Sequence, residues 1–458
     1  MNVVHLSTYD VRGGAALAAY RLHRAMLKRS ECHSRMLVGK KESRDPSVSP
    51  VYLSESPWPR IRRVWQRREV LREHAIHARA IAKQEIFSDD RGWWTDSIAA
   101  NIKGADVVQL HWICQFLNYS RFFQDVPMHI PLVWRLADKN PLTGGCHYDS
   151  GCGRFESACG SCPKLDSSDS DDLSHQIWAR KKSALERITH ERLHIVALNQ
   201  WMRGQVRRSS LLGRFDCSVI PNGVDLDEFK PINPVAAREA LLIPPQSKVV
   251  AFVAESASNE RKGFALLLEA LRALRDRANL FLLIVGDTQQ LPPIGLPNLQ
   301  VGLVQSVAFL RLIYSAAHVF VISSLEDNQP NTVLESMACG TPVVGFNVDG
   351  IPEMVEHGKT GWLATPGSVS ELAQGIEALL DRDAERLAMG SEARLTVEQS
   401  FSRNRQVAQY LTLYQRLLES RQVGATVSSR VASSGPDSDG CASNSGQGQG
   451  WSGLVQKR

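Results

Sequence analysis

The stretch VFVISSLEDNQPNTVLESMACGTPVVGF, residues 319–346, decides the fold class of this chain. An apolar run of strand length leads into an acidic loop, and a helical stretch follows that ends at Gly340. Pro342 then opens a second apolar run. This order predicts two strands of a parallel α/β sheet with a helix between them. In such sheets ligands bind beyond the carboxyl ends of the strands, so the acidic loop is the first candidate site.

The same alternation runs along most of the chain. Helical stretches are expected at 15–28, 263–275, 306–316, 332–339 and 370–380. Strands are expected at 3–6, 35–38, 106–110, 132–136, 194–197, 249–253, 280–285, 319–322 and 342–346. The pattern predicts two doubly wound parallel sheets. The expected order is an N-terminal domain (1–218), a C-terminal domain (219–390), helices that pack back on the first domain (391–420) and a disordered, Ser/Gly/Gln-rich tail (421–458).

Composition places the chain among ordinary globular proteins. Of its 458 residues, 43% are hydrophobic and 22% are charged, and the length predicts two or three domains. The net charge of +5 is too small to indicate a nucleic-acid partner. No apolar run approaches the ~20 residues that cross a bilayer, and the N-terminus lacks a signal-peptide pattern. We therefore expect a cytoplasmic protein whose cysteines are reduced.

Residues 323–363 carry the strongest motif. They resemble the signature of retaining glycosyltransferases of family 4, which have the α/β GT-B fold: two Rossmann-like domains face a central cleft, and a C-terminal helix crosses back to the first domain. In that family two acidic residues separated by seven others flank the sugar nucleotide. Counting back from Glu335 places the first on Asp327, with Glu326 beside it. The family has a pair of glutamates, so which of Glu326 and Asp327 meets the transferred sugar stays open.

The helix after the acidic loop provides further candidates. Its first N–H groups, at Asn331 and Thr332, and its positive dipole end suit a phosphate. The resemblance implies that these groups meet the donor diphosphate and that Glu335 holds the ribose hydroxyls. From the residues alone, Thr332 and Glu335 also fit a capping box, in which Glu335 only satisfies N–H groups of its own helix.

A basic turn, ESASNERKG at 255–263, follows another expected strand. Breaking a sugar–diphosphate bond leaves negative charge on the departing group, and fixed cations can neutralise it. Arg261 and Lys262 suit this role, although a solvated basic turn is the alternative. The resemblance matches Lys262, whereas Ser256 stands where the family has an arginine, and Arg261 is expected to replace it. With Asp327 and Glu335, these two cations complete the expected catalytic set.

Three features of the N-terminal half are expected near the substrates. The first strand leads into a loop with Gly13 and Gly14, which the resemblance places against the donor, although most glycine pairs are plain turns. His111 follows a strand, where α/β enzymes keep ligand contacts, and the resemblance implies that it contacts the sugar; a structural histidine is the alternative. Asp138 is expected on the acceptor side, where relatives carry His-Asp and this chain has Ala137 before it.

A glycine-rich insert at 143–165 holds four cysteines, Cys146, Cys152, Cys159 and Cys162, spaced C-x5-C-x6-C-x2-C. Four thiols this close suit a structural zinc, while labile disulfides or free thiols are the alternatives. The insert resembles one found in a subset of family 4 enzymes of bacterial surface-polysaccharide clusters.

Residues 57–85 predict a basic amphipathic helix, with arginines at Arg60, Arg62, Arg63, Arg67, Arg68 and Arg72. A solvated helix face is one interpretation. The other is peripheral contact with anionic lipid at the inner face of the plasma membrane.

The resemblance implies a retaining transferase that moves a hexose from a nucleotide-diphosphate sugar to a saccharide acceptor. The acceptor is expected to be lipid-linked, in bacterial capsule, exopolysaccharide or lipopolysaccharide biosynthesis, and no cofactor is expected to be required for catalysis. Two alternatives stay open: a sugar-nucleotide epimerase of the same fold, and a non-catalytic nucleotide-sugar-binding partner.

Overall fold

The computed structural model describes residues 1–433 apart from 52–56, 83–85, 93–97, 278, 289–290 and 292. Its first sheet has seven parallel strands in the order β3-β2-β1-β4-β5-β6-β7. These are β1 (Asn2–Tyr9), β2 (His33–Lys40), β3 (Val48–Pro50), β4 (Val107–Leu110), β5 (Leu132–Arg135), β6 (Leu193–Ala197) and β7 (Cys217–Val219). We call the part of the chain built on this sheet the first lobe.

The second sheet has six parallel strands in the order β10-β9-β8-β11-β12-β13. They are β8 (Lys248–Ser256), β9 (Leu280–Asp287), β10 (Asn298–Gln300), β11 (Val319–Ile322), β12 (Val343–Phe346) and β13 (Gly361–Ala364). We call the part built on this sheet the second lobe. Its central strands are apolar throughout because helices cover both faces.

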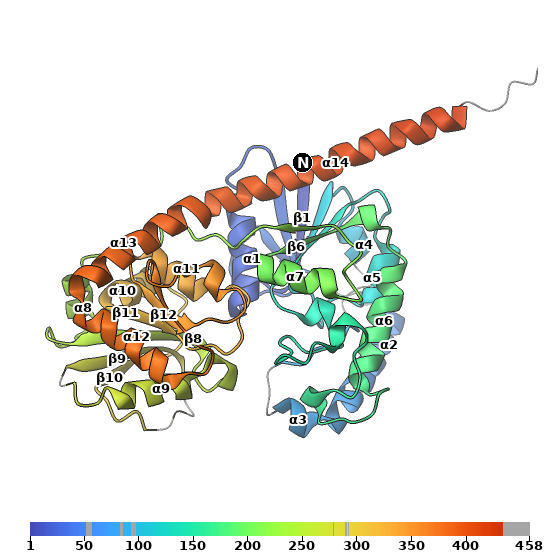
Figure 1. Cartoon of the computed structure of the whole chain (residues 1–458). Helices are drawn as coiled ribbons and strands as arrows, with labels where there is room; N and C mark the ends of the chain where they lie inside the picture. The colour runs from blue at the N-terminus through green and yellow to red at the C-terminus, as the bar shows by residue number, and fades with distance from the viewer. Residues whose placement is uncertain are drawn as a thin grey trace, which may run out of the picture. The chain divides into compact units, whose positions relative to one another are not determined.

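Most of the α-helices lie between strands in the sequence, and α12, α13 and α14 follow the last strand (Figure 1). They are α1 (Gly13–Met26), α2 (Pro57–Ile76), α3 (Ala78–Ala82), α4 (Ile98–Asn101), α5 (Tyr119–Asp125), α6 (Leu173–Glu186), α7 (Gln200–Arg208), α8 (Pro234–Ala240), α9 (Phe264–Ala273), α10 (Val307–Ala316), α11 (Asn331–Ala338), α12 (Val369–Asp381), α13 (Asp383–Ser400) and α14 (Arg403–Ser433). Helix α9 packs with α12, whereas α10 packs with α8 and α11. This is the expected doubly wound arrangement.

The expected strands and helices are present, with four short strands added at or near the sheet edges: β3, β7, β10 and β13. They read VSP, CSV, NLQ and GWLA, and none of them is a continuous run of branched or aromatic apolar residues such as marks the central strands. The helix expected over 57–85 is divided by a turn at His77 into α2 and α3, and residues 83–85 lie outside the described chain.

The C-terminal helix returns to the first lobe, as expected. Tyr414 of α14 is fully buried, and its hydroxyl donates to Oε1 of Gln109 on β4 at 2.8 Å. Helix α14 continues to Ser433, past Arg421 where we expected a disordered tail to begin, and residues 421–433 permit this because they contain no proline. The rest of that tail, 434–458, lies outside the described residues.

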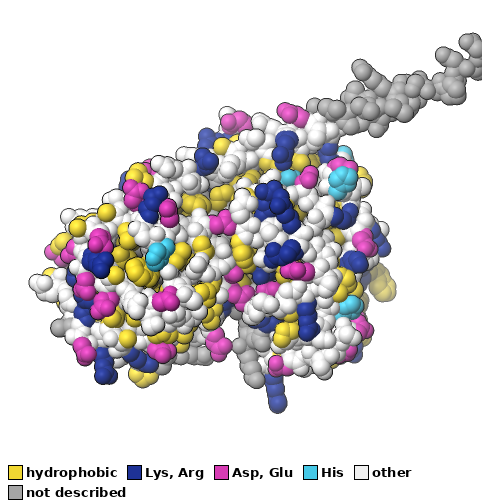
Figure 2. Space-filling model, in the orientation of Figure 1, with side chains coloured by type: hydrophobic (Ala, Val, Ile, Leu, Met, Phe, Trp, Pro, Cys, Tyr) yellow, Lys and Arg dark blue, Asp and Glu magenta, His cyan; other side chains and the backbone are white. Residues whose placement is uncertain are grey.

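The domain boundaries stay predictions: the first sheet ends at Val219, the second begins at Lys248, and residues 1–414 form one compact unit. On the face seen in Figure 2, basic and acidic side chains are interspersed. None of the described helices is long and apolar enough to span a bilayer.

Candidate active site

The basic turn after β8 and the acidic loop after β11 lie side by side because these two strands are paired in parallel. The turn is a short 3-10 helix, Glu260–Lys262, and the side chain of Asn259 caps it by accepting the N–H of Arg261 at 3.0 Å. Gly263 then adopts φ +65°, and a Cβ there would lie 1.9 Å from the Ser323 carbonyl oxygen. Only glycine therefore allows the turn to approach β11 so closely.

Both predicted cations contact the predicted acid. Nζ of Lys262 donates to Oδ2 of Asp327 at 2.6 Å, and the Arg261 guanidinium lies 3.4 Å from the same oxygen. Arg261 also donates to the carbonyl of Glu326 at 2.6 Å. Burial alone would raise the pKa of Asp327, but the charges of Lys262 and Arg261 hold it below its ordinary value. Asp327 is therefore an ionised partner of both cations.

Asp349, in the loop after β12, is a site residue that the sequence analysis missed. Its Oδ2 accepts the N–H of Asp327 at 2.9 Å, and its backbone adopts a left-handed φ of 49°. Burial, with the charges of Glu326 and Asp327, raises the pKa of Asp349 to about 7, and Lys139 opposes the rise. Its position after a central strand was the signal that could have identified it.

The start of α11 adjoins the glycine loop of the first lobe. Nδ2 of Asn331 donates to the carbonyl of Gly14 at 3.0 Å. Gly13 adopts φ +79°, and a Cβ there would lie 3.5 Å from Oε2 of Glu255, at the end of β8. Pro330 precedes the helix, and among the described side chains none caps its first turn. The structure thus brings Gly13 and Gly14 to the predicted diphosphate position.

The acidic loop is also tied to the first lobe through Asn328, which is 2% exposed. Its amide Nδ2 donates to the carbonyl of Ala137 at 3.0 Å, just after β5. In return, Nδ2 of Asn199 donates to the Asn328 carbonyl at 2.7 Å. These contacts fix the loop that carries Glu326 and Asp327.

Glu335 is buried, and both of its carboxylate oxygens have protein partners. Arg21 of α1 donates to Oε1 at 2.6 Å, and the hydroxyl of Tyr314 donates to Oε2 at 2.9 Å. The capping-box alternative is wrong, because Pro330 precedes the helix and Thr332 lies inside it. The ribose contact of Glu335 stays a prediction, and a ribose there has to share the carboxylate with Arg21.

The side-chain contacts of His111 and Asp138 lie within the first lobe, and their contacts with the sugar and the acceptor stay predictions. His111 is 2% exposed, and its Nε2 is 2.9 Å from Nδ1 of His5, with the two rings stacked inside the first lobe. Burial lowers the pKa of both histidines well below the ordinary value. Asp138 accepts from Nε1 of Trp112 at 2.9 Å and pairs with His147 at 2.7 Å. Both residues therefore make contacts that organise the first lobe.

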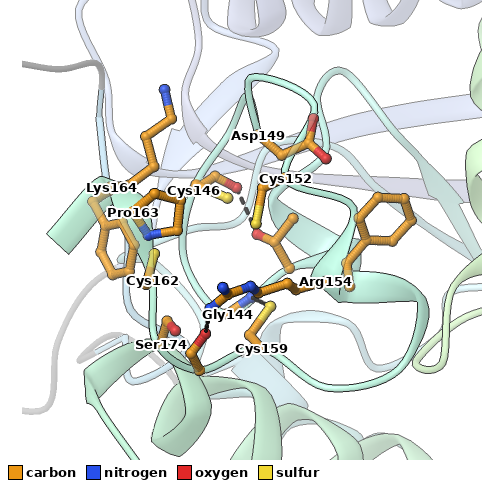
Figure 3. A pocket seen from close by; sticks show the side chains of 14 residues that line it. Gly144, Cys146, Asp149, Cys152, Arg154, Cys159, Cys162, Pro163, Lys164 and Ser174 are labelled. Atoms are coloured by element: carbon orange, nitrogen blue, oxygen red, sulfur yellow. Dashed lines mark hydrogen bonds between the residues drawn. The ribbon is translucent and has the colours of Figure 1, made fainter. Parts of the chain in front are cut away.

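The four cysteines of the insert line a single cavity of about 20 Å³ (Figure 3). The N–H of Gly144 donates to Sγ of Cys159 at 3.1 Å, and Arg154 also lines the cavity. Burial raises the pKa of the Cys159 thiol to about 11. No group of three or more His, Cys, Asp or Glu side chains in the described ranges is arranged to hold a metal ion. As arranged here, the cysteines do not fit a bound zinc, and zinc stays a prediction.

Residues 247–382 match the family model "Glycosyl transferases group 1", which covers the turn at 260–262, the acidic loop and α11. A D-inositol 3-phosphate glycosyltransferase of Corynebacterium glutamicum is 30% identical over 226 residues, 45% of this chain and 53% of the relative. An N-acetyl-alpha-D-glucosaminyl L-malate synthase of Bacillus anthracis is 33% identical over 150 residues, 31% of this chain and 39% of the relative. The chain thus spans about half the length of these curated relatives, or less.

Solved structures extend the likeness to both lobes. Sucrose-phosphate synthase from Thermosynechococcus elongatus has a TM-score of 0.64 at 18% identity and covers 92% of this chain and 99% of its own. HepE from Anabaena, in complex with UDP and glucose, has a TM-score of 0.62 at 16% identity and covers 91% and 100%. The chain therefore has the GT-B fold, and its second lobe carries a glycosyltransferase group 1 segment.

Proposed function

We propose that this chain is a glycosyltransferase that moves a hexose from a nucleotide-diphosphate sugar to a saccharide acceptor. One observation carries the proposal: Arg261 and Lys262 lie against Asp327 beside the uncapped start of α11. Cations and helix N–H groups at one sheet edge are what a diphosphate needs. The family match over 247–382 supports the same interpretation.

The role of the two cations follows from where negative charge develops during transfer of the sugar. As the bond between sugar and diphosphate breaks, negative charge grows on the departing phosphate, and Arg261 and Lys262 stabilise it. Lys262 is paired with Asp327 in the present structure. A bound diphosphate therefore replaces Asp327 as the partner of Lys262. Asp327 is then available to accept from sugar hydroxyls. We propose retention of configuration, with the acceptor attacking from the face that the phosphate leaves.

We also propose that the acceptor is lipid-linked and that α2 contacts an anionic membrane during surface-polysaccharide assembly. The outward face of α2 carries large apolar side chains among its charged ones: Trp58 is 78% exposed and Trp65 is 67% exposed, while Val70 on the opposite face is buried. Arg68 and Arg72 lie on the exposed side. Exposed tryptophans beside arginines suit the interface of an anionic bilayer.

Co-sedimentation with liposomes of neutral and of anionic lipid tests this contact. The variant Arg68→Glu/Arg72→Glu should lose binding to anionic liposomes. A matched variant, Arg275→Glu/Arg382→Glu, makes the same charge change at exposed arginines of the second lobe and should bind as wild type does. Equal binding by all three proteins would refute the membrane contact.

A panel of nucleotide sugars, beginning with UDP-glucose, tests the activity. Released nucleotide is measured with and without saccharide and lipid-linked saccharide acceptors, and products are identified by mass spectrometry. Acceptor-dependent glycosylation supports transfer. Isomerised sugar without transfer indicates the epimerase. Binding without turnover indicates a non-catalytic partner. Either result overturns the proposal.

The zinc prediction has its own test. Metal analysis of protein purified without added metal should find one zinc per chain if the four cysteines rearrange to hold it, and a Cys159→Ser/Cys162→Ser variant should then lose it. A metal-free wild-type protein whose four cysteines react as free thiols on unfolding would show that the insert folds without metal.

A further inference from the structure

The cysteine-rich insert carries a short segment, Tyr148–Ser150, that reaches the acidic loop of the second lobe. The centre of the Tyr148 ring lies 3.8 Å from the guanidinium carbon of Arg261. The N–H and the hydroxyl of Ser150 donate to the two carboxylate oxygens of Glu326, at 3.1 and 2.9 Å. One turn of the first lobe thus contacts both a candidate catalytic cation and the acidic residue beside Asp327.

Two lysines of the first lobe, Lys139 and Lys164, hold this segment in place. Asp149 lies between the two contact residues, and its Oδ1 accepts from Nζ of Lys139 at 2.5 Å in a buried ion pair. Nζ of Lys164 donates to the hydroxyl of Ser150 at 2.7 Å, which leaves the hydroxyl hydrogen directed to Glu326. The insert therefore presents Tyr148 and Ser150 on a turn with its own anchors.

We propose that Tyr148 and Ser150 are positioning residues of the transfer site, so that the insert completes the donor site of the other lobe. Tyr148 covers the face of the Arg261 guanidinium while the Glu326 carbonyl holds its edge, and these two contacts restrict the arginine to one orientation. Ser150 holds the neighbouring carboxylate. This inference rests on the proposed function.

Orientation matters here because a cation stabilises a leaving group only if it is already aimed at the developing charge. An arginine side chain has many rotamers, and a mobile guanidinium must be ordered during the reaction. The stacked ring removes that cost beforehand. The same contact makes Arg261 sensitive to the insert, since any movement of residues 148–150 moves the surface on which the guanidinium lies.

The test compares Tyr148→Ala, Tyr148→Phe and Ser150→Ala, with Glu156→Gln as a matched change in the same insert. Glu156 pairs with Arg208 on the exposed surface. Steady-state kcat and KM are measured with the donor that turns over fastest in the nucleotide-sugar panel, and UDP binding is measured by calorimetry. Thermal unfolding checks that each variant is folded.

We expect Tyr148→Ala to lower kcat by about tenfold to a hundredfold with a smaller change in KM. Tyr148→Phe keeps the ring and should keep the wild-type kcat. Ser150→Ala should lower kcat less than Tyr148→Ala, and Glu156→Gln should match wild type.

If folded Tyr148→Ala turns over as wild type does, or if Tyr148→Phe is as slow as Tyr148→Ala, stacking does not position Arg261. A wild-type protein that neither binds UDP nor turns over any donor overturns the proposed function, and this inference with it.

Discussion

The two lobes contribute to the site in different ways. In the second lobe the site residues follow strand ends directly: the turn with Arg261 and Lys262 comes after β8, the acidic loop comes after β11, and Asp349 comes after β12. In the first lobe the glycine loop follows a strand in the same way, and so do Ala137 after β5 and Asn199 after β6, which contact the acidic loop. Arg21 lies inside α1, and Tyr148 and Ser150 lie in an insert. The second lobe therefore carries its candidate site residues at strand ends, whereas the first lobe also contributes residues from a helix and an insert.

The acidic pair shows the same contrast. Asp327 has its cationic partners within its own lobe, from the neighbouring strand end. Glu335 has its cationic partner, Arg21, in the other lobe. A partner on an adjacent strand end is expected from parallel topology, whereas a partner in another lobe depends on how the two sheets meet.

The largest effect should come from the cations of the second lobe. Lys262→Ala should lower kcat by about 10²–10³-fold, as removal of one preorganised charge-stabilising donor does. Steady-state kinetics with the donor chosen from the panel measure it. Lys359→Ala removes an exposed lysine of the same lobe and should leave kcat unchanged. If Lys262→Ala retains wild-type kcat in folded protein, the leaving group does not lie at this turn.

Much of this second lobe could be predicted from sequence. The strand at 319–322 has the predicted bounds, and its neighbours differ by a few residues. Continuous apolar runs define such strands, because strands in the middle of a parallel sheet are buried on both faces. Asp349 was missed because no motif surrounds it, and only its position after a central strand marks it as a candidate.

The first lobe was harder to predict for physical reasons. His111 follows a strand end, yet its side chain packs on His5 within the lobe, and sequence position alone does not reveal which way a side chain turns. Tyr148 lies in an insert whose course depends on buried contacts such as Lys139 with Asp149. Contacts between distant segments of this kind leave no periodic signal.

A large effect on stability, rather than on rate, should come from the pair that joins the lobes. Arg21→Met keeps an unbranched apolar side chain but removes the guanidinium, which lies over the Phe229 ring, and so leaves Glu335 without its cation. Because both side chains are largely buried, we expect the free energy of unfolding to fall by about 3 kcal/mol. Urea denaturation followed by tryptophan fluorescence measures the loss.

An exposed pair provides the control for Arg21. Lys182 and Glu186 lie one helical turn apart on α6, and Lys182→Ala should cost no more than about 0.5 kcal/mol. Equal losses in Arg21→Met and Lys182→Ala would mean that the pair between the lobes is not formed in solution. A double-mutant cycle with Glu335→Gln separates the pair from the single side chains.

The smallest effect is a pH dependence located at Asp349. Its pKa is raised from 3.8 to about 7, so between these values the folded state binds a proton that the unfolded state has lost. Stability contributed by Asp349 is therefore present at low pH, falls as pH rises through this window and is constant above it. Asp349→Asn can still accept the Asp327 N–H but cannot ionise. The urea midpoint of the variant minus that of wild type should therefore increase from pH 5 to pH 8.

The comparison uses one variant against wild type at each pH, which cancels the titration of all other groups. A difference that does not change with pH would show that Asp349 is ionised across the whole range, and the candidate site would then hold Glu326, Asp327 and Asp349 as three charges beside Arg261 and Lys262.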